Sequence, residues 1–218
     1  MIEIKSPARL KIIDPASLDV AFINRHSLAS RLSVSKTLPI EDGRLSMTPE
    51  EIAATTPAAV LVPLVNRPEG LTVLLTRRTD HLNDHAGQIS FPGGKVDAGD
   101  ANAEDTALRE TEEEIGLDRR CVQLLGRLPD YFIPTGFRVT PIVGWVEPPF
   151  KLVLDSFEVA AAFEVPLSHV IDPAHRQMQS AMRSGRLRHF YAMPYEGYNI
   201  WGATAGMLVI LSRMLNDE

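Results

Sequence analysis

The stretch Gly93–Leu117, GGKVDAGDANAEDTALRETEEEIGL, places two adjacent glycines before an acidic loop and a run of strong helix formers. The apolar run QISFP just before it is typical of a strand, so the glycines predict a tight backbone turn between strand and loop. Residues 103–117 predict a helix, which Gly116 would end in the left-handed conformation. A turn beside acidic residues indicates metal and phosphate chemistry, although two glycines by themselves suit any turn.

Three glutamates of this helix share one side. With Glu110 at zero on a helical wheel, Glu114 lies at about 40° and Glu113 at about −60°. Carboxylates spaced three and four residues apart repel one another, and a hard divalent cation offsets that repulsion by binding their oxygens. The carbonyl of Gly93 would reach the same cation if the loop folds over the helix, since glycine permits a close approach. A solvated acidic face paired with arginines is the alternative explanation.

Strand-like runs surround the helix. AAVLVPLV and LTVLLTR, separated by the turn NRPEG, predict a hairpin, and TAGMLVILSRML predicts an apolar-faced C-terminal helix. Further strands are predicted in CVQLLGRL, RVTPIVGWV, VAAAFEV, RHFYAMPY and GYNIW. This order of elements indicates an α/β or α+β sandwich with a mixed sheet and helices on both faces.

The N-terminal quarter differs from the rest of the chain. Residues 1–55 read as a partly helical extension and residues 56–218 as one domain. A helix start is predicted in MTPEEIAATT, where Thr48 is the N-cap, Pro49 takes the first helical position and Glu51 completes a capping box. No chemistry is assigned to the extension, which leaves a lid, a homodimer arm or simple packing open.

Composition limits the partners. The chain of 218 residues carries a net charge of −6, which argues against nucleic acid as the main partner but permits a phosphorylated small molecule with a metal ion. The single cysteine, Cys121, cannot form an internal disulfide and is expected to be a small buried hydrophobe. No signal peptide or membrane span is seen, so a soluble cytoplasmic protein without a membrane partner is expected.

The stretch that opens with the two glycines resembles the Nudix box. That signature consists of a glycine, an acidic residue, Arg-Glu, an apolar position, Glu-Glu and Gly-apolar. The matching residues are Gly94, Asp100, Arg109, Glu110, Thr111, Glu113, Glu114, Gly116 and Leu117. Two departures are visible: Asp100 replaces the usual glutamate and is separated from Arg109 by eight rather than seven residues, and Thr111 replaces a larger apolar residue.

Residues 74–94, LLTRRTDHLNDHAGQISFPGG, are similar to the signature of the coenzyme A pyrophosphatase branch of the Nudix hydrolases. The matching positions are Leu74, Leu75, Thr76, Arg78, Gly87, Phe91, Pro92, Gly93 and Gly94. Thr79 stands where Ser or Ala is usual, and Asn83 stands where Arg is usual. VTPIVG, EVAAAFEVPLSHVID and YNIWGATAGML also resemble this branch, so the resemblance extends over residues 57–215.

The resemblance implies a Nudix-type α/β/α sandwich with a mixed sheet over residues 56–218. It implies an enzyme that requires Mg²⁺ or Mn²⁺, both of which prefer oxygen ligands. Glu110, Glu113 and Glu114 are then the metal-binding and catalytic cluster, and Gly93 contributes its carbonyl as a further metal ligand.

Two further residues receive catalytic roles from the resemblance. Arg109 would orient a glutamate through a charge-assisted pair, and the alternative is that it only balances the acidic helix. Glu158, just before VAAAFEV, is the candidate for a distant carboxylate that takes the proton from water, and a surface charge on a loop is its alternative. A member of the helix cluster is the other candidate for that base.

Five residues in and after the hairpin are candidates for substrate binding. Arg77, Arg78 and His85 are expected to contact substrate phosphates, with surface packing as the alternative. Gln88 and Phe91 are expected to line the pocket for pantetheine or adenine, and a core position is the alternative for Phe91.

The leading function is hydrolysis of coenzyme A, or of its derivatives, to 3′,5′-ADP and 4′-phosphopantetheine. Asn83 keeps a second substrate class open, namely ADP-ribose, NADH or a nucleoside triphosphate. A nucleotide-binding module without turnover is the third hypothesis, which the intact Glu110, Glu113 and Glu114 disfavour.

Overall fold

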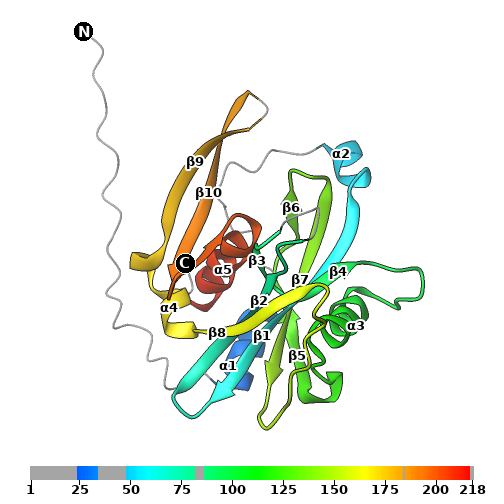
Figure 1. Cartoon of the computed structure of the whole chain (residues 1–218), viewed down its shortest axis with the longest axis vertical. Helices are drawn as coiled ribbons and strands as arrows, with labels where there is room; N and C mark the ends of the chain where they lie inside the picture. Colours follow the sequence, from blue (N-terminus) through cyan, green and yellow to red (C-terminus); the bar gives the residue numbers. More distant parts are fainter. Residues whose placement is uncertain (1–23, 34–47, 82–85, 184, 217–218) are drawn as a thin grey trace.

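A computed structural model describes residues 24–33, 48–81, 86–183 and 185–216. A mixed β-sheet forms its centre, with a helix against each face (Figure 1). The strands of this sheet are β1 (Thr56–Arg67), β2 (Gly70–Arg78), β3 (Ile89–Ser90), β4 (Gly93–Lys95), β5 (Val122–Arg127), β6 (Tyr131–Ile133), β7 (Phe137–Val146) and β8 (Val159–Pro166).

The remaining elements lie before, beside and after the sheet. A smaller sheet holds β9 (Gln177–Arg183), β10 (Arg186–Tyr195) and β11 (Tyr198–Trp201). The described helices are α1 (Arg25–Ser33), α2 (Pro49–Ala53), α3 (Ala103–Ile115), α4 (Leu167–Ile171) and α5 (Ala203–Leu215), with short 3₁₀ turns at Arg119–Cys121 and Pro173–His175.

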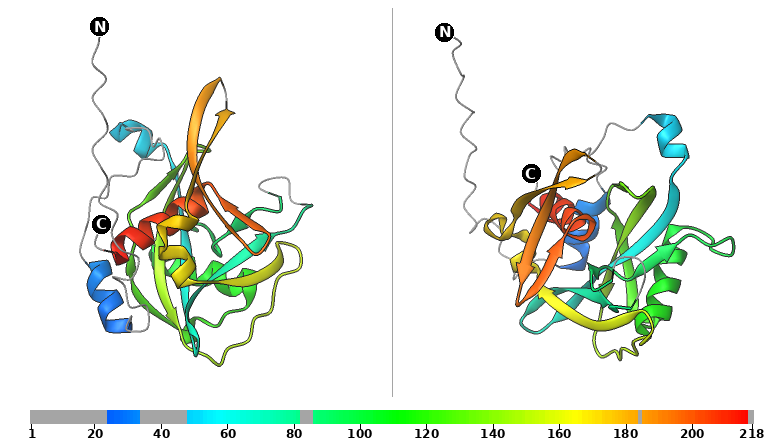
Figure 2. Two further views of the ribbon diagram at one scale, coloured as in Figure 1. Left: turned by 90° about the vertical axis from the view of Figure 1, so that its left-hand side faces the viewer. Right: turned by 45° about the horizontal axis from the view of Figure 1, so that its top comes forward.

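Pairing around β1 makes the sheet mixed. β1 runs parallel to β7 and antiparallel to β2 and β4. Because successive side chains of a strand point to opposite faces, β1 supplies both apolar layers. Val62 and Leu64 join the cluster that contains α5, while Leu61 and Val65 join the cluster that contains α3. The predicted α/β sandwich with helices on both faces is therefore confirmed, and Figure 2 shows the two layers from the side.

Helix α3 forms where the sequence predicted it. The Asn102 side chain caps its first turn, and Gly116 ends it with φ 66°. Ala107, Thr111 and Ile115 are buried against the sheet. Thr111 is tolerated there because its hydroxyl donates to the Ala107 carbonyl at 2.6 Å, so no polar atom is left unpaired.

The two glycines before the acidic loop allow close packing of β4. Gly93 has φ 151°, and a Cβ at this residue would lie 2.4 Å from the Ala59 carbonyl oxygen. A Cβ at Gly94 would lie 2.4 Å from the carboxylate carbon of Glu110. Glycine is thus required here because β4 is pressed between β1 and the acidic face of α3.

Two features of the N-terminal region bear on the domain prediction. The predicted capping box of α2 is confirmed, with Thr48 and Glu51 bonded to each other's backbone N–H. Leu28 and Leu32 of α1 are buried in the same cluster as α5. The helical spacing of Leu18, Phe22 and Ile23 predicts a helix that lies outside the described residues, and the boundary at residue 55 stays a prediction.

Two smaller expectations also meet the structure. Cys121 is a free, partly buried thiol that packs against the apolar layer containing α3. Among the described helices, none combines the length and the apolar character needed to cross a membrane.

Candidate active site

Glu114 is the most enclosed carboxylate of α3, with a side chain that is 7% exposed. It accepts one hydrogen bond, from the Gly93 backbone N–H at 3.2 Å. Burial, together with the charges of Glu158 and Glu110, raises the pKa of Glu114 to about 8, although the Gly93 hydrogen bond and the charge of Arg78 lower it. The positive charge nearest to this carboxylate, that of Arg78, is shared with Glu158 and does not offset the cost of burial.

Arg78, at the end of β2, faces two carboxylates from different elements. Its Nη1 lies 3.8 Å from Glu114 Oε1 and 3.7 Å from Glu158 Oε2. Both distances are too long for hydrogen bonds, but they are within ion-pair range. The structure therefore brings Glu158 and Arg78 together with the acidic helix.

The loop that carries Glu158 is fixed by backbone hydrogen bonds. Thr79 donates its N–H to the Glu158 carbonyl at 2.9 Å and its hydroxyl to the Phe157 carbonyl at 2.8 Å. Asp155 N–H donates to the Glu114 carbonyl at 2.9 Å. From the sequence, Thr79 was noted only as a departure from the usual Ser or Ala. Its hydroxyl, which can donate a hydrogen bond, was the feature that could have indicated the contact with Phe157.

Arg109 pairs mainly with Asp100. Its Nε and Nη2 lie 2.8 and 2.9 Å from the two carboxylate oxygens of Asp100, whose side chain is 3% exposed. The hydrogen bonds from Arg109 hold the pKa of Asp100 well below its usual range. Arg109 also reaches Glu110 at 3.1 Å and Glu113 at 3.0 Å. The guanidinium thus ties the acidic loop to the side of the helix that carries Glu110 and Glu113.

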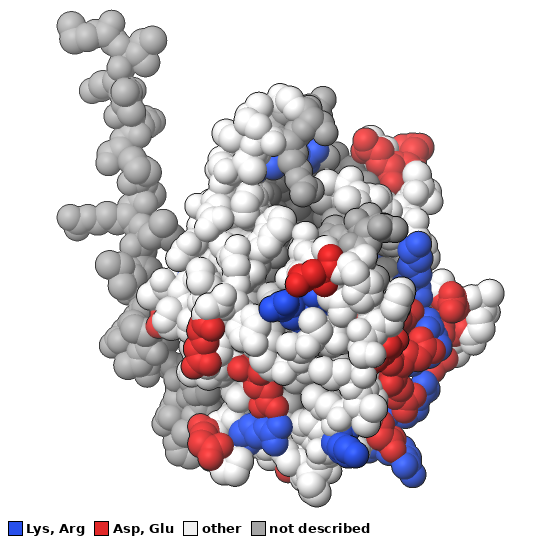
Figure 3. Space-filling view, viewed as in Figure 1, with Lys and Arg blue, Asp and Glu red and all other residues white. Residues whose placement is uncertain are grey.

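The glutamates of α3 fall into two groups. Burial raises the pKa of Glu110, and the charge and hydrogen bond of Arg109 oppose the rise. Glu112 instead pairs with Arg119, which also binds Asp105. Figure 3 shows acidic and basic side chains intermixed along the edge where α3 lies. The alternative of an arginine-paired acidic face therefore describes Glu112 and Glu113. Glu110 is also paired with Arg109, but it lies against Gly94, while Glu114 faces Gly93 and Arg78.

The donor set fits a hard divalent cation by its chemistry. Glu110 and Glu114 are carboxylates with side chains that are mostly enclosed, and Mg²⁺ and Mn²⁺ prefer carboxylate oxygens. Within the described ranges, no three His, Cys, Asp or Glu side chains are gathered as a ready ligand set. Glu113 is 60% exposed and paired with Arg109, so it would have to change partner to join them.

The predicted substrate-binding residues lie in different surroundings. Arg77 is 41% exposed and pairs with Asp80 at 3.3 Å. Arg77 and Gln88 line one groove. Phe91 is 2% exposed and packs in the core with α5, which corrects its expected pocket position, because it offers no surface to a ligand. His85, like Asn83, lies outside the described residues.

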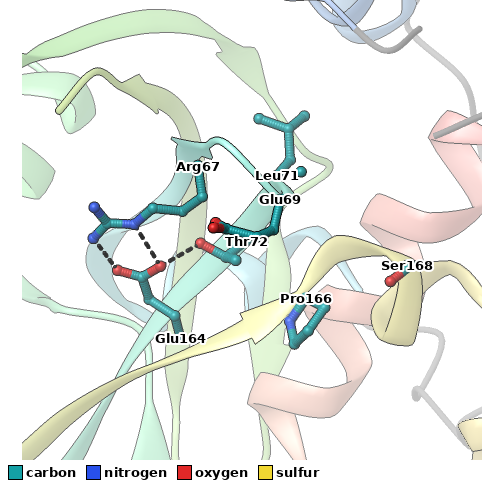
Figure 4. A pocket seen from close by; sticks show the side chains of 8 residues that line it. Arg67, Glu69, Leu71, Thr72, Glu164, Pro166 and Ser168 are labelled. Carbon is teal, nitrogen blue, oxygen red and sulfur yellow. Dashed lines mark hydrogen bonds and ion pairs between the residues drawn. The ribbon is translucent and has the colours of Figure 1, made fainter. Parts of the chain in front are cut away.

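A second hollow of about 500 Å³ lies at the other end of β2 (Figure 4). Its main charged groups satisfy each other. Arg67 binds Glu164 at 3.0 and 2.5 Å, and the Thr72 hydroxyl donates to Glu164 at 2.6 Å. These contacts join β1, β2 and β8, so we assign the charged groups of this hollow a structural role.

Comparison with known proteins identifies the family. Residues 55–181 match the family described as "NUDIX domain". An uncharacterized Nudix hydrolase NudL of Yersinia enterocolitica is 43% identical over 159 residues, which cover 73% of this chain and 81% of that protein. A NudL of Yersinia pestis is 39% identical over 195 residues, covering 89% and 94%. The chain belongs to the Nudix hydrolase family and is a hydrolase that acts on pyrophosphate bonds.

Solved structures are more distantly similar. A C. elegans Ap4A hydrolase binary complex is 22% identical, with a TM-score of 0.45 over 50% of this chain and 80% of that chain. The Nudix domain of Shewanella oneidensis NrtR complexed with ADP ribose is 20% identical, with a TM-score of 0.42 over 58% and 82%. Family membership rests on the sequence matches.

Proposed function

We propose that this Nudix hydrolase cleaves coenzyme A, or its derivatives, to 3′,5′-ADP and 4′-phosphopantetheine. The observation that carries the proposal is the convergence of Arg78 and Gly93 on Glu114. Both come from residues 74–94, the segment that resembles the coenzyme A pyrophosphatase signature, so this segment borders the carboxylate cluster directly.

The reaction adds one water across a phosphoanhydride bond. The water oxygen bonds to one phosphorus, the bond from that phosphorus to the bridging oxygen breaks, and the bridging oxygen leaves with the other phosphate. The attacking water must lose a proton, for which Glu158 and the α3 cluster are the proposed bases. Glu158 fits this role because it is 41% exposed yet held beside Glu114 through Arg78.

Glu110, Glu113, Glu114 and the Gly93 carbonyl are the proposed holders of Mg²⁺ or Mn²⁺. When bound, such an ion activates water and neutralises charge on phosphate oxygens. Arg109 keeps the helix and the acidic loop in register through Asp100. Arg78 and Arg77 are proposed to bind phosphate oxygens of the substrate, since a guanidinium presents several donors to an anion.

A variant tests the ligand assignment. Glu114→Gln keeps the size of the side chain but removes its charge, so turnover is expected to fall by about 100-fold or more with a normal melting curve. Added Mn²⁺ is expected to stabilise the wild-type protein but not the Glu114→Gln variant. A Glu114→Gln enzyme with wild-type turnover would exclude the role of Glu114 as a ligand.

A product assay tests the substrate. The purified protein is incubated separately with coenzyme A, ADP-ribose, NADH and ATP, with Mg²⁺ or Mn²⁺, and the products are separated by chromatography. Metal-dependent release of 3′,5′-ADP, at a kcat/KM well above that for the other substrates, is expected. Preferential turnover of ADP-ribose or NADH would assign the second substrate class, and binding without turnover would assign a non-catalytic module.

A further inference from the structure

A groove of about 560 Å³ lies where β2 and β3 meet the smaller sheet. Arg77 and Gln88 line one side of it, and Tyr198, Asn199 and Trp201 of β11 line the other. Figure 2 shows the turn between β10 and β11 beside the projecting end of β2. Two segments more than a hundred residues apart in the chain therefore form one surface.

The aromatic rings of this groove are held by other aromatic rings. Tyr198 stacks on Phe163 of β8, with ring centroids 3.7 Å apart and planes 5° from parallel. Trp201 and Phe190 of β10 make a T-shaped contact, with ring centroids 5.5 Å apart. These contacts fix the ring positions before any ligand arrives, which lowers the entropy cost of binding.

The polar groups of β11 are available. Within the part of the chain that the structure describes, the Tyr198 hydroxyl, the Asn199 amide and the Trp201 indole N–H make no hydrogen bond. The ion pair of Arg77 with Asp80 has side chains that are 41% and 76% exposed, so a phosphate can replace Asp80 at little cost. The groove therefore offers ring faces, an amide and a cation to one ligand.

The groove and the carboxylate cluster both lie next to the short pairing of β2 with β3. Arg77 reaches the groove, whereas its neighbour Arg78 reaches Glu114 and Glu158. The Arg78 N–H donates to the Gln88 carbonyl at 3.0 Å, which joins the two strands at this point. A substrate whose phosphates lie at the cluster can extend past the end of this strand pairing into the groove.

We propose that this groove binds the nucleoside 3′-phosphate half of the substrate and that Asn199 and Trp201 determine its specificity. The inference rests on the proposed function. A base stacks on ring faces, an amide recognises its hydrogen-bonding edge, and Arg77 pairs with the phosphate. The matched family domain ends at residue 181, so Arg77 lies inside it, while Asn199 and Trp201 of β11 lie outside it.

Two variants test the groove. Asn199 is exposed, so Asn199→Ala is expected to fold normally, and Trp201→Leu removes the ring face. Each is expected to raise KM for coenzyme A by about 10-fold and to leave kcat within about 3-fold of the wild-type value. This is the pattern for a contact that is equally strong in the ground state and in the transition state. Each is also expected to weaken binding of 3′,5′-ADP by about 10-fold in calorimetry, while binding of 4′-phosphopantetheine stays unchanged. Tyr195→Ala, on the same hairpin but outside the groove, is the matched control.

The outcomes separate this inference from the proposed function. Unchanged KM and unchanged 3′,5′-ADP affinity in both variants would overturn the groove assignment while coenzyme A hydrolysis stands. Weaker 4′-phosphopantetheine binding instead would also overturn it. If the wild-type protein does not hydrolyse coenzyme A, the proposed substrate fails, and the 3′,5′-ADP arm alone decides: binding lost in Asn199→Ala supports the groove, and absent wild-type binding rejects it.

Discussion

At the scale of single residues, Arg78 is the cation closest to Glu114 that the structure shows. It stands 3.8 Å from Glu114 and 3.7 Å from Glu158, two carboxylates that otherwise repel each other. In the metal-free protein it therefore acts as their counter-ion. A divalent cation at the same carboxylates would compete with this guanidinium and free it for the phosphates of a substrate.

This competition predicts opposite effects of one substitution. Arg78→Met is expected to lower the Tm of the metal-free protein, because the two carboxylates lose their shared counter-ion. The same change is expected to tighten Mn²⁺ binding by about 3- to 10-fold in calorimetry without substrate, since no cation competes. Arg77→Met removes the neighbouring guanidinium, which faces Asp80, and is expected to leave Mn²⁺ affinity unchanged. Weaker Mn²⁺ binding in Arg78→Met would show instead that Arg78 assembles the ligands.

Residue-level prediction from sequence worked where contacts are local. The arc of Glu110, Glu113 and Glu114 follows from helix periodicity. In the structure, Glu110 and Glu114 lie against β4. The pairing of Arg78 with Glu114 joins residues from two elements, and no periodicity in one chain segment encodes it. Phe91 was ambiguous because an apolar residue in a signature fits both a pocket and a core.

At the scale of elements, β4 and α3 pack without room for a side chain at Gly94. A Cβ there would lie 2.4 Å from the Glu110 carboxylate, whereas a Cβ at Gly99 in the following loop would meet nothing within 4 Å. The fit of β4 against the helix thus sets the position of one proposed metal ligand.

This packing predicts a sharp contrast between two glycine substitutions. Gly94→Ala is expected to destabilise the fold by about 1–3 kcal/mol through overpacking and to reduce turnover by displacing Glu110. Gly99→Ala is the control and is expected to leave both nearly unchanged. Chemical denaturation and steady-state kinetics measure the two effects. Equal behaviour of the variants would mean that β4 shifts freely away from α3.

A second prediction concerns the contact that joins β1 and β2 to β8. Burial alone would raise the pKa of Glu164, but hydrogen bonds from Arg67 and Thr72 lower it below its ordinary value. A carboxyl with a lowered pKa in the folded state stabilises the protein above its unfolded pKa and loses this effect as pH falls. Glu164→Gln is therefore expected to cost about 1–2 kcal/mol at pH 7, and less below pH 4. Urea denaturation at both pH values tests it, and a constant difference would contradict it.

The elements themselves were predicted unevenly. Helix α3, α5 and the hairpin of β1 and β2 follow from clear periodicity and turn residues, and all three are confirmed. β9 was not predicted, because QMQSAMR has no β-branched residue and no clear apolar alternation. It forms through its pairing with β10, which a local pattern cannot reveal.

At the scale of the whole molecule, the N-terminal region contributes to the core. Leu28 is 0% exposed and Leu32 is 5% exposed, and both lie in the cluster that contains α5. Arg25 of the same helix donates to the Gln123 side chain on β5 at 2.8 Å. Helix α1 is therefore packed as part of the main fold.

Helix α1 predicts a single unfolding transition. Leu28→Ala is expected to lower the free energy of unfolding by about 2–4 kcal/mol and to shift the whole transition together. Ser30→Ala, at an exposed position of the same helix, is the control and is expected to have little effect. Denaturation followed by both tryptophan fluorescence and circular dichroism measures this. A separate early transition would mean that α1 unfolds independently.

The parallel pairing of β1 with β7 also constrains how the chain reaches this fold. The two central strands are Thr56–Arg67 and Phe137–Val146, so about seventy residues intervene between them. Contacts of such wide sequence separation slow folding, because a long loop must close before they form. During synthesis, α3 leaves the ribosome before β7 does. Glu158, which faces Arg78, also follows α3 in the chain, so Arg78 can face both glutamates only after that later segment has been synthesised.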